Sequence, residues 1–441
     1  MHRIVEEINY CRKKMNVTYY GFSHDMLTLD KKYINSLCET LIDYYKRSKM
    51  KSTWSCSART DCVTKYMLNV MWKSGCRAIF FGIESGSEKI QKIINKNLNL
   101  TDAVKKVNYA TNLGMKVIVS YMAGFHDETD EDIDKTLRSV LRMAITGAEP
   151  QMTLLSILPG TSLYQQFIDK LEYDGKSFGI SGSSMTEPVT DLVKTNRRLF
   201  SSFYFLPNEH LEREDLLFIS YLVNLLIHFL PTIRSVREYL ESDITNFLFH
   251  DFIKKFRLTH SETGSLTEQG LYFLTNAFKQ YLEYLSFRGL KEYIPDLFQA
   301  DFTKAYMQVK YNKWQYIRAS GNQLPKISSV YSMDDRLKII PVWKIISTRF
   351  NIQHFANNHL DILGKPRLKR GNYNYLVLPV SEKYCKLLRV PGKYLHILKS
   401  LKDMEIKDFI YNCEPVMVKN RALKMLKRLV KLGMIEIHCK K

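Results

Sequence analysis

Two features that many proteins carry are missing from this sequence. No basic segment followed by an apolar stretch stands at Met1, so there is no recognisable secretory leader. The eight cysteines include no CxxC pair, and they fit reduced thiols in a cytoplasm better than a disulfide framework. The longest apolar run, 216–230, contains Asn224 and His228 and is too short to span a bilayer, which predicts a buried helix. We therefore expect a cytoplasmic protein with no membrane partner.

Composition indicates a globular chain with an uneven charge. An apolar share of 45% with 12% aromatics excludes wholesale disorder, and 441 residues predict two or three domains. The net charge is +20, and residues 366–441 hold 18 Lys and Arg against 6 Asp and Glu. One interpretation is that this charge only reflects a lysine-rich composition shared by the whole proteome. The other is a basic tail that meets an acidic peptide or a nucleic acid.

The first 165 residues alternate between strand and helix patterns. The predicted strands are Val17–Phe22, Thr53–Ala58, Ala78–Ile83, Val117–Ala123 and Met152–Leu158. The predicted helices begin at Asp30, Thr64, Thr101 and Thr129, with Asp132 at capping-box spacing from the last, and Gly75 and Gly114 end two of them. Five strands, each followed by a helix, predict parallel pairing with right-handed crossovers. The fold class is therefore α/β, either a βα barrel or an open sheet.

Beyond residue 165 the alternation is lost. We expect the βα part to end in a Gly/Ser-rich boundary, giving a domain over 1–190. A mostly helical region over 191–318 and an irregular linker over 319–365 follow. Residues 366–441 combine a strand, three helices and a closing strand, which predicts a basic winged-helix-like domain.

In a parallel βα array the carboxyl ends of the strands form the functional face. The residues expected there are Ser23, His24, Asp25, Ser57, Arg59, Glu84, Ser85, Gly124, Phe125, His126, Leu158 and Pro159. A nucleoside fits this set. A carboxylate can accept both ribose hydroxyls, an arginine can pair with an amino acid's carboxylate, and apolar strand ends can flank adenine.

The stretch "IFFGIESGSE" concentrates this chemistry at one strand end. Gly82 and Gly86 flank Glu84 and Ser85, and we expect them to let backbone and ligand approach closely. The alternative is that Glu84 caps the following helix, whose N-terminus attracts negative charge. Composition alone leaves both interpretations open.

Several stretches in order carry a resemblance to a known family. They are "YYGFSHDMLTLDKK", "WSCSARTD", "GCRAIFFGIESGSEKI", "GMKVIVSYMAGFHDETDEDI", "LLSILPGTSLY" and "NRRLFSSFYFLP". Together they resemble the radical SAM superfamily, and more narrowly its branch with an upstream cobalamin-binding domain, over residues 1 to about 210. The resemblance implies a partial (β/α)6 TIM-like barrel, here without its first strand. It also implies an S-adenosylmethionine-dependent radical enzyme. Members of the cobalamin branch transfer methyl groups to peptide or natural-product substrates.

The resemblance also assigns binding roles. It places Glu84 or Ser85 at the ribose of S-adenosylmethionine, Arg59 and Ser23 near the methionyl part, and Ser120 and Leu158 at the adenine. It assigns no catalytic residue. A 4Fe-4S cluster and cobalamin are expected of the family.

The family's three cluster cysteines, spaced CxxxCxxC, are not in the sequence. Cys56, Cys62 and Cys76 are a poor substitute at their spacing, and Cys56 reads as a core residue. His24 and His126 lack further ligands at metal spacing, so no metal site is predicted. We expect the cluster loop and any cobalamin domain on a separate N-terminal polypeptide, or lost from this chain.

The tail helix "VKNRALKMLKRLVKLG" places Leu423, Leu426, Leu429 and Val430 on one face and Lys424, Lys427, Arg428 and Lys431 opposite. The basic face is either simply solvated, a docking site for an acidic peptide, or a DNA-binding surface, in decreasing order of expectation. For the whole chain, the alternatives to an enzyme are a degenerate barrel that binds peptide or nucleic acid through this tail, and a remnant without function.

Overall fold

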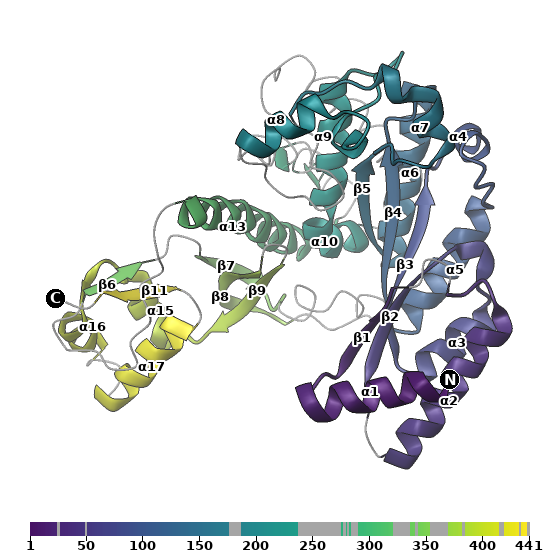
Figure 1. Ribbon diagram of the computed structural model, residues 1–441. Helices are drawn as coiled ribbons and strands as arrows, with labels where there is room; N and C mark the ends of the chain where they lie inside the picture. The colour runs from purple at the N-terminus through teal and green to yellow at the C-terminus, as the bar shows by residue number, and fades with distance from the viewer. Residues whose placement is uncertain are drawn as a thin grey trace. The chain divides into compact units, whose positions relative to one another are not determined.

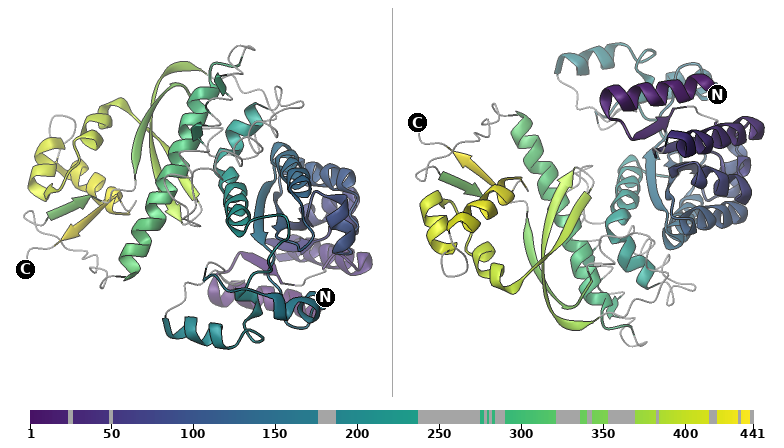
Figure 2. Two further views of the ribbon diagram at one scale, coloured as in Figure 1. Left: turned by 90° about the horizontal axis from the view of Figure 1, so that it is seen from above. Right: turned by 90° about the horizontal axis from the view of Figure 1, so that it is seen from below.

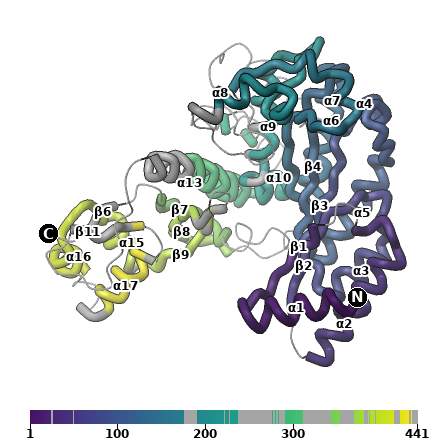
Figure 3. Tube along the Cα trace, viewed as in Figure 1, coloured from purple at the N-terminus to yellow at the C-terminus, as the bar shows by residue number. Residues whose placement is uncertain are grey.

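The computed structural model describes the coloured parts of Figure 3, which are residues 1–23, 27–48, 51–175, 187–236, 275–276, 279, 282–283, 290–320, 336–339, 343–352, 369–381, 384–413, 419–431 and 434–438. The chain divides into two compact units, residues 1–265 and 266–441. Within the described residues, no helix has the length and apolar character needed to cross a membrane. Most of the predicted Gly/Ser-rich boundary, residues 176–186, lies outside them.

The first unit is built on one parallel sheet, shown in Figure 1. Its strands are β1 (Tyr19–Phe22), β2 (Thr53–Ala58), β3 (Cys76–Glu84), β4 (Lys116–Ala123) and β5 (Glu149–Leu154), each paired with the next along the chain. Because the spatial order follows the chain order, every right-handed crossover runs in the same direction and its helix falls on the same face. This arrangement confirms an α/β fold with five parallel strands and is consistent with a partial barrel.

The helices that connect the strands of this unit begin where short polar side chains cap them, whereas the first helix, with Met1 at its N-cap, has no side-chain cap. These helices are α1 (His2–Met15), α2 (Lys31–Ser48), α3 (Lys65–Lys73), α4 (Glu88–Ile93), α5 (Leu100–Asn112) and α6 (Asp130–Thr146). Asp30 Oδ1 accepts from Lys32 N at 2.8 Å, Thr64 caps α3, and Thr129 with Asp132 forms the predicted capping box on α6. The expected helix start at Thr101 was wrong by two positions, because Asn99 caps α5.

The two faces of the sheet differ in burial. Side chains such as Trp54, Phe81 and Tyr121 are fully buried, and Tyr121 Oη lies 2.9 Å from Ser139 Oγ of α6, so their face packs against the helices. The opposite, inner face carries Ser55, Ser57, Ala78, Phe80, Gly82, Ser120 and Gln151, which neighbour one another in register. Figure 2 shows the crossover helices gathered along one side of the strands. The inner face therefore carries mostly small or polar side chains near the strand ends.

The two edges of the sheet are treated differently. At β5, helix α9 (Arg213–Leu225) lies alongside, and Asn224 Oδ1 accepts from Met152 N at 3.1 Å while Asn224 Nδ2 and Ser220 Oγ donate to Met152 O at 2.8 and 2.9 Å. Pro150, which faces the same way, has no N–H to offer. At β1, no strand of the described chain pairs on the outer side, and Tyr19 is 53% exposed.

A smaller apolar cluster follows β5. It is formed by Ile157, Phe167, Ile168, Leu171, Val193, Tyr204 and Leu206 around α7 (Ser162–Phe167) and α8 (Glu187–Thr195). The short helix α10 (Leu230–Ser235) continues beyond α9. The described residues between 191 and 318 include the end of α8, then α9, α10 and most of α13 (Ile294–Ser320), and the predicted bounds of a helical region stay a prediction.

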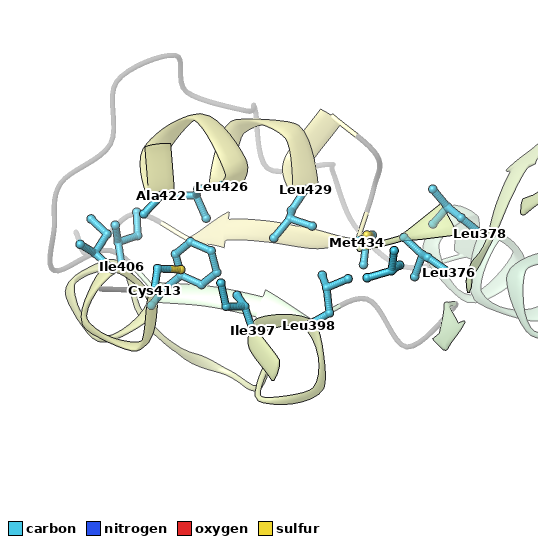
Figure 4. Close-up of a cluster of buried hydrophobic side chains, with 13 residues drawn as sticks. Leu376, Leu378, Ile397, Leu398, Ile406, Cys413, Ala422, Leu426, Leu429 and Met434 are labelled. Atoms are coloured by element: carbon cyan, nitrogen blue, oxygen red, sulfur yellow. The ribbon is translucent and has the colours of Figure 1, made fainter. Parts of the chain in front are cut away.

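The second unit has an antiparallel sheet between two apolar layers. Its strands are β7 (Lys344–Phe350), β8 (Arg370–Ser381) and β9 (Tyr384–Val390). Alternate residues of β8 point to opposite sides, because Tyr375 and Val377 pack with α13 while Leu376 and Leu378 join a different core. That second core is shown in Figure 4. It is built by α15 (Gly392–Lys399), α16 (Ile406–Cys413) and α17 (Lys419–Lys431).

The predicted irregular linker over 319–365 was wrong where the structure describes it. It contains β7 and β6 (Arg336–Ile339), and β6 is the central strand between β10 (Met404–Glu405) and β11 (Ile435–His438). A domain that starts at residue 366 would therefore lack the strand to which β11 pairs. The three predicted helices and the closing strand appear as α15, α16, α17 and β11, the short strand β10 was not predicted, and the winged-helix assignment stays a prediction.

Candidate functional site

The site is centred on Glu84, the last residue of β3, whose backbone is unusual. Its φ is 66°, in the left-handed region, and the β3–β4 register shifts between Gly82 and Glu84. A residue with a side chain pays about 1–2 kcal/mol for this conformation. Strain of this kind persists only when the surroundings fix it, and it concentrates at functional sites.

Gln91 of α4 fixes the bend at Glu84. Its buried amide nitrogen donates to Ile83 O at 2.6 Å and to Ser85 O at 2.7 Å, the carbonyls on either side of Glu84. Its Oε1 accepts from Leu98 N at 3.3 Å, and its backbone carbonyl accepts from Lys96 N at 3.0 Å. Gln91 therefore joins the strand end to the loop that carries Lys96.

The Glu84 carboxylate turns back over the inner face of the sheet. It pairs with Lys96 Nζ, and the two side chains are only 17% and 14% exposed. A Cβ at Gly82 would meet Glu84 Oε1 and would lie 2.9 Å from Lys96 Nζ. Gly82 thus leaves the space over the strand that this ion pair occupies, and Ser120 is the residue that neighbours Gly82 on β4.

The interpretation of Glu84 as a helix cap is wrong. Ser87 is the N-cap of α4 and accepts from Ile90 N at 3.4 Å. The predicted role of Gly86 also changes. A Cβ there would lie 2.5 Å from Lys135 O and 2.7 Å from Thr136 Cα, so Gly86 serves the packing against α6 and not the approach of a ligand.

Ser85, the second predicted ribose residue, is engaged inside the protein. It is fully buried, its Oγ lies 3.0 Å from Thr136 Oγ1, and it accepts from Ser87 N at 3.1 Å. Its hydroxyl ties the strand end to α6. Between the two predicted ribose residues, the geometry favours Glu84.

Arg59 directly follows β2 and lies in a group of charged residues. Its guanidinium donates to the Asp61 carboxylate at 2.7 and 3.0 Å and to Lys96 O at 2.9 Å. The hydrogen bond to Arg59 lowers the pKa of Asp61, and the same bond raises the pKa of Arg59. The structure therefore brings Arg59 and Glu84 together through Lys96. The Lys96 side chain pairs with Glu84, and the Lys96 carbonyl accepts from Arg59.

Lys96 is the site residue that the sequence reasoning missed. It lies 12 positions beyond Glu84, in a loop where Asn95 and Asn97 have φ values of 52° and 50°. Asparagine is the residue besides glycine that most readily adopts this conformation. The run "NKN" was thus a readable signal of a tight turn that presents one lysine.

The remaining predicted residues lie at other strand ends. Ser120 is buried on β4, on the same face as Glu84. Ser23 is exposed directly after β1, at the neighbouring edge, and His24 and Asp25 lie outside the described residues. The predicted strand end at Leu158 was wrong, because β5 ends at Leu154, and Leu158 lies in a loop where its carbonyl accepts from Thr161 Oγ1 at 2.8 Å.

A second carboxylate, Glu128, follows β4. Its Oε2 accepts from Gly124 N at 2.7 Å and from Phe125 N at 3.3 Å, and Oε1 is buried with no hydrogen-bond partner among the described residues. Burial raises the pKa of Glu128 to about 7. Asn208 also donates to its carbonyl at 3.0 Å. Glu128 therefore holds the loop, and sequence reasoning did not single it out.

The described residues do not fit a 4Fe-4S cluster. They contain no group of three or more His, Cys, Asp or Glu side chains that could hold a metal ion. Cys56 and Cys76 are buried, and the bond to Cys56 together with burial raises the pKa of the Cys76 thiol, which disfavours the thiolate. His126, whose Nδ1 lies 3.2 Å from Pro207 O, packs on Phe167.

Residues 2–140 match the family model described as Radical SAM superfamily. An uncharacterized methyltransferase of Pyrococcus horikoshii is 27% identical over 168 residues, covering 38% of this chain and 35% of the relative. The chain thus matches about a third of that relative's length.

Solved structures give weaker likenesses. The radical S-adenosylmethionine methyltransferase TsrM from Kitasatospora setae, with cobalamin and a 4Fe-4S cluster bound, is 12% identical and covers 63% of this chain and 55% of its own, with a TM-score of 0.40. The cobalamin-dependent radical enzyme OxsB is 12% identical over 73% of this chain and 51% of its own, with a TM-score of 0.35. Coproporphyrinogen III oxidase of Escherichia coli is 17% identical over 34% of each chain, with a TM-score of 0.29.

Proposed function

Because residues 2–140 are a radical SAM superfamily domain, we propose that this chain binds S-adenosylmethionine on the inner face of its parallel sheet and serves radical chemistry. The observation that carries the proposal is the strained Glu84, whose carboxylate lies over Gly82, the register neighbour of Ser120. Its oxygens are suited to accept the two ribose hydroxyls. The methyltransferase relative and the cobalamin branch favour methyl transfer to a peptide or natural-product substrate as the outcome.

The other groups of the site suit the remaining parts of the ligand. Phe80 and Ser120 lie on the inner face, where adenine can rest against them. Lys96 and Arg59 supply positive charge where the methionyl carboxylate would lie. When S-adenosylmethionine is bound and reduced in this family, it supplies the radical that abstracts a substrate hydrogen.

We propose that the cluster comes from a separate polypeptide segment, because the described residues offer no ligand set for it. The open outer edge of β1 supports this, since a parallel strand can add there while β5 is covered by α9. The cobalamin requirement rests on the resemblance, and we assign no residue to it.

Binding of S-adenosylmethionine to the full chain tests the ligand assignment. Isothermal titration should show weak affinity, millimolar at best, because a cluster normally anchors the methionyl part. Glu84→Ala should lose about 1.5–3 kcal/mol, which is roughly ten- to a hundredfold in Kd. Glu88→Ala, an exposed carboxylate four residues away, is the matched control. Equal affinity in wild type and Glu84→Ala would contradict the ribose role.

Iron analysis tests the cluster assignment. After anaerobic reconstitution, the purified chain should hold far less than one cluster, as judged by iron and sulfide content and by visible absorption. A full cluster on this chain alone would contradict the proposal. Cys56→Ala would then show whether the cysteines at 56, 62 and 76 were responsible.

For the second unit we propose docking of an acidic peptide. On α17, Arg421, Lys424, Lys427 and Arg428 are exposed while Ala422, Leu426 and Leu429 are buried in the core of Figure 4. The edge strand β11 offers backbone groups for an added peptide strand. A degenerate barrel that only binds peptide or nucleic acid through this surface remains the alternative function.

Fluorescence anisotropy of the full chain with an acidic peptide and with duplex DNA, across salt, separates these partners. A peptide held mainly by backbone bonds should be weakened modestly when Lys424, Lys427 and Arg428 are changed to Glu. DNA binding through α17 should fall steeply with salt and vanish in that variant. Tight duplex binding of this kind would overturn the peptide proposal.

A further inference from the structure

The loop that follows β4, residues 124–128, is tied to a segment far along the chain, residues 207–211. Asn208 Nδ2 donates to Phe125 O at 2.6 Å and to Glu128 O at 3.0 Å. Asn208 Oδ1 accepts from two backbone N–H groups of its own segment. The amide therefore uses both its donors and its acceptor to hold the loop in place, and this tie does not depend on pH.

A second tie between the same two parts runs through the ring of His126. Its Nδ1 lies 3.2 Å from Pro207 O, and its Nε2 lies 3.6 Å from Glu209 Oε1. Both oxygens can only accept, because a backbone carbonyl and an ionised carboxylate carry no hydrogen. A neutral imidazole has one N–H and can satisfy one of them, whereas an imidazolium donates to both.

We propose that His126 is a pH-sensitive clamp, which docks the loop fully onto residues 207–209 only when both ring nitrogens carry a proton. When one proton is lost, a nitrogen lone pair faces an acceptor oxygen, and the loop is held less firmly as pH rises. This inference rests on the proposed function for its effect at the ligand site, and it names a regulation of that site.

The surroundings of the ring contain charges of both signs, and the one in contact with it is acidic. The His126 side chain is only 20% exposed, so water compensates little for a lost partner. The charged groups on the elements packed around it are Glu209 on the docked segment, Asp127 and Glu128 on the loop, Lys89, which donates to Asp127 O, and Lys170, whose Nζ lies 5.6 Å from the Phe167 ring. The two lysines oppose a second proton on the ring, whereas the contact with Glu209 favours it.

The clamp acts beside the proposed ligand site. The loop directly follows β4, and β4 pairs with the strand that ends at Glu84. On the other side, Lys89 of α4, the helix that follows Glu84, donates to Asp127 O at 2.6 Å. The loop thus connects that helix with residues 207–209, and loosening it at high pH should weaken ligand binding at the ends of β3 and β4.

Two measurements on the full chain, at about pH 6 and about pH 8.5, test this inference on either side of the range in which histidine changes charge. Hydrogen–deuterium exchange of residues 124–128, corrected for intrinsic rates, reports opening of the loop, and isothermal titration reports the affinity for S-adenosylmethionine. From high to low pH, protection and affinity should each rise about two- to fivefold more in wild type than in His126→Phe, as expected for an ion pair with one exposed partner. Phenylalanine keeps a ring against Phe167, and the pH response of Glu128, present in both proteins, cancels in the comparison.

A second variant and a control separate the outcomes. Glu209→Gln replaces the carboxylate by an amide that can also donate, so it should reduce the pH dependence even if His126→Phe does not fold. His210→Gln changes an exposed histidine of the same segment and should behave as wild type. Equal pH dependence in wild type, His126→Phe and Glu209→Gln would overturn this inference.

The two readouts also keep this inference apart from the proposed function. Loop exchange that follows His126 while the affinity for S-adenosylmethionine does not would overturn the regulation and leave the proposed function intact. Loop exchange that follows His126 in a chain that binds no S-adenosylmethionine at either pH would support the clamp and contradict the proposed function.

Discussion

Glu84 and Glu128 both follow a strand of the same sheet, yet they are placed in opposite ways. Glu84 sits in a left-handed backbone, and its carboxylate faces the inner side of the sheet beside Lys96. Glu128 is fully buried, and its carboxylate accepts from the Gly124 and Phe125 N–H groups of its own loop.

The difference separates a carboxylate that stabilises its own loop from one that the backbone turns over the inner face of the sheet. The Glu128 carboxylate accepts hydrogen bonds from the backbone of its own loop. At Glu84 the backbone itself is bent, and the Gln91 side chain holds that bend through two hydrogen bonds. Backbone strain that displays a side chain supports the role proposed for Glu84. Three measurements test whether the two carboxylates differ in this way.

The largest effect concerns pH and Glu128. Its pKa of about 7 lies above its ordinary value of 4.5, so the folded state holds the proton more tightly than the unfolded state. The stability from this proton is complete below pH 4.5 and is lost as pH rises through 7, in total about 3 kcal/mol. Urea unfolding across this range should show the fall, and Glu128→Gln should remove that part of it. The same fall in both proteins would show that Glu128 is not its source.

The second effect concerns the support of Glu84. Gln91→Leu removes the side-chain donor to Ser85 O and the acceptor of the Leu98 N–H, while Ile83 O keeps its bond from Ser85 N, and this should cost about 2 kcal/mol of unfolding free energy. It should also weaken S-adenosylmethionine about as much as Glu84→Ala does. Gln165→Leu, at an exposed position on α7, should change stability by less than about 0.5 kcal/mol. Unchanged ligand affinity in Gln91→Leu would remove its positioning role.

The smallest effect isolates the backbone strain. Glu84→Gly and Glu84→Ala both lose the ion pair, but only glycine adopts a φ of 66° without penalty. Glu84→Gly should therefore be the more stable variant by about 1 kcal/mol in urea unfolding. At Glu128, where φ is not positive, the order should reverse, with alanine favoured by about 0.5–1 kcal/mol. The same order at both positions would contradict the contrast between them.

Local signals in the sequence predicted much of the sheet and of the helix starts. The strand at Thr53–Ala58 appears with the predicted bounds, because its apolar pattern acts within a few residues. The end of β5 was misplaced because the apolar run continues to Leu158, while the pairing with β4 includes Glu149 and Pro150 at the other end. Strands β6 and β7 were missed because their paired residues lie 20 to 102 positions away in the chain.

The site was predicted in its types of residue but not in its geometry. Glu84 was found from its place after an apolar strand, but the choice between helix cap and ligand required its backbone angle and the true cap, Ser87. Ser85 shares the same local pattern, and only its burial against Thr136 separates it from Glu84. Lys96 could not be inferred from spacing, because a loop brings it back to the strand end.

The covered edge of β5 has a consequence for how copies of this protein can associate. A sheet that is open at both edges can add neighbours without limit, as in fibrils. Here the Met152 N–H donates to Asn224, the Met152 carbonyl accepts from Asn224 and Ser220, and Pro150 has no N–H donor. Growth by strand pairing at this sheet is then confined to β1, which gives it a valence of one. One second copy joined edge to edge through β1 terminates the assembly, because the β5 edge of that copy is covered as well.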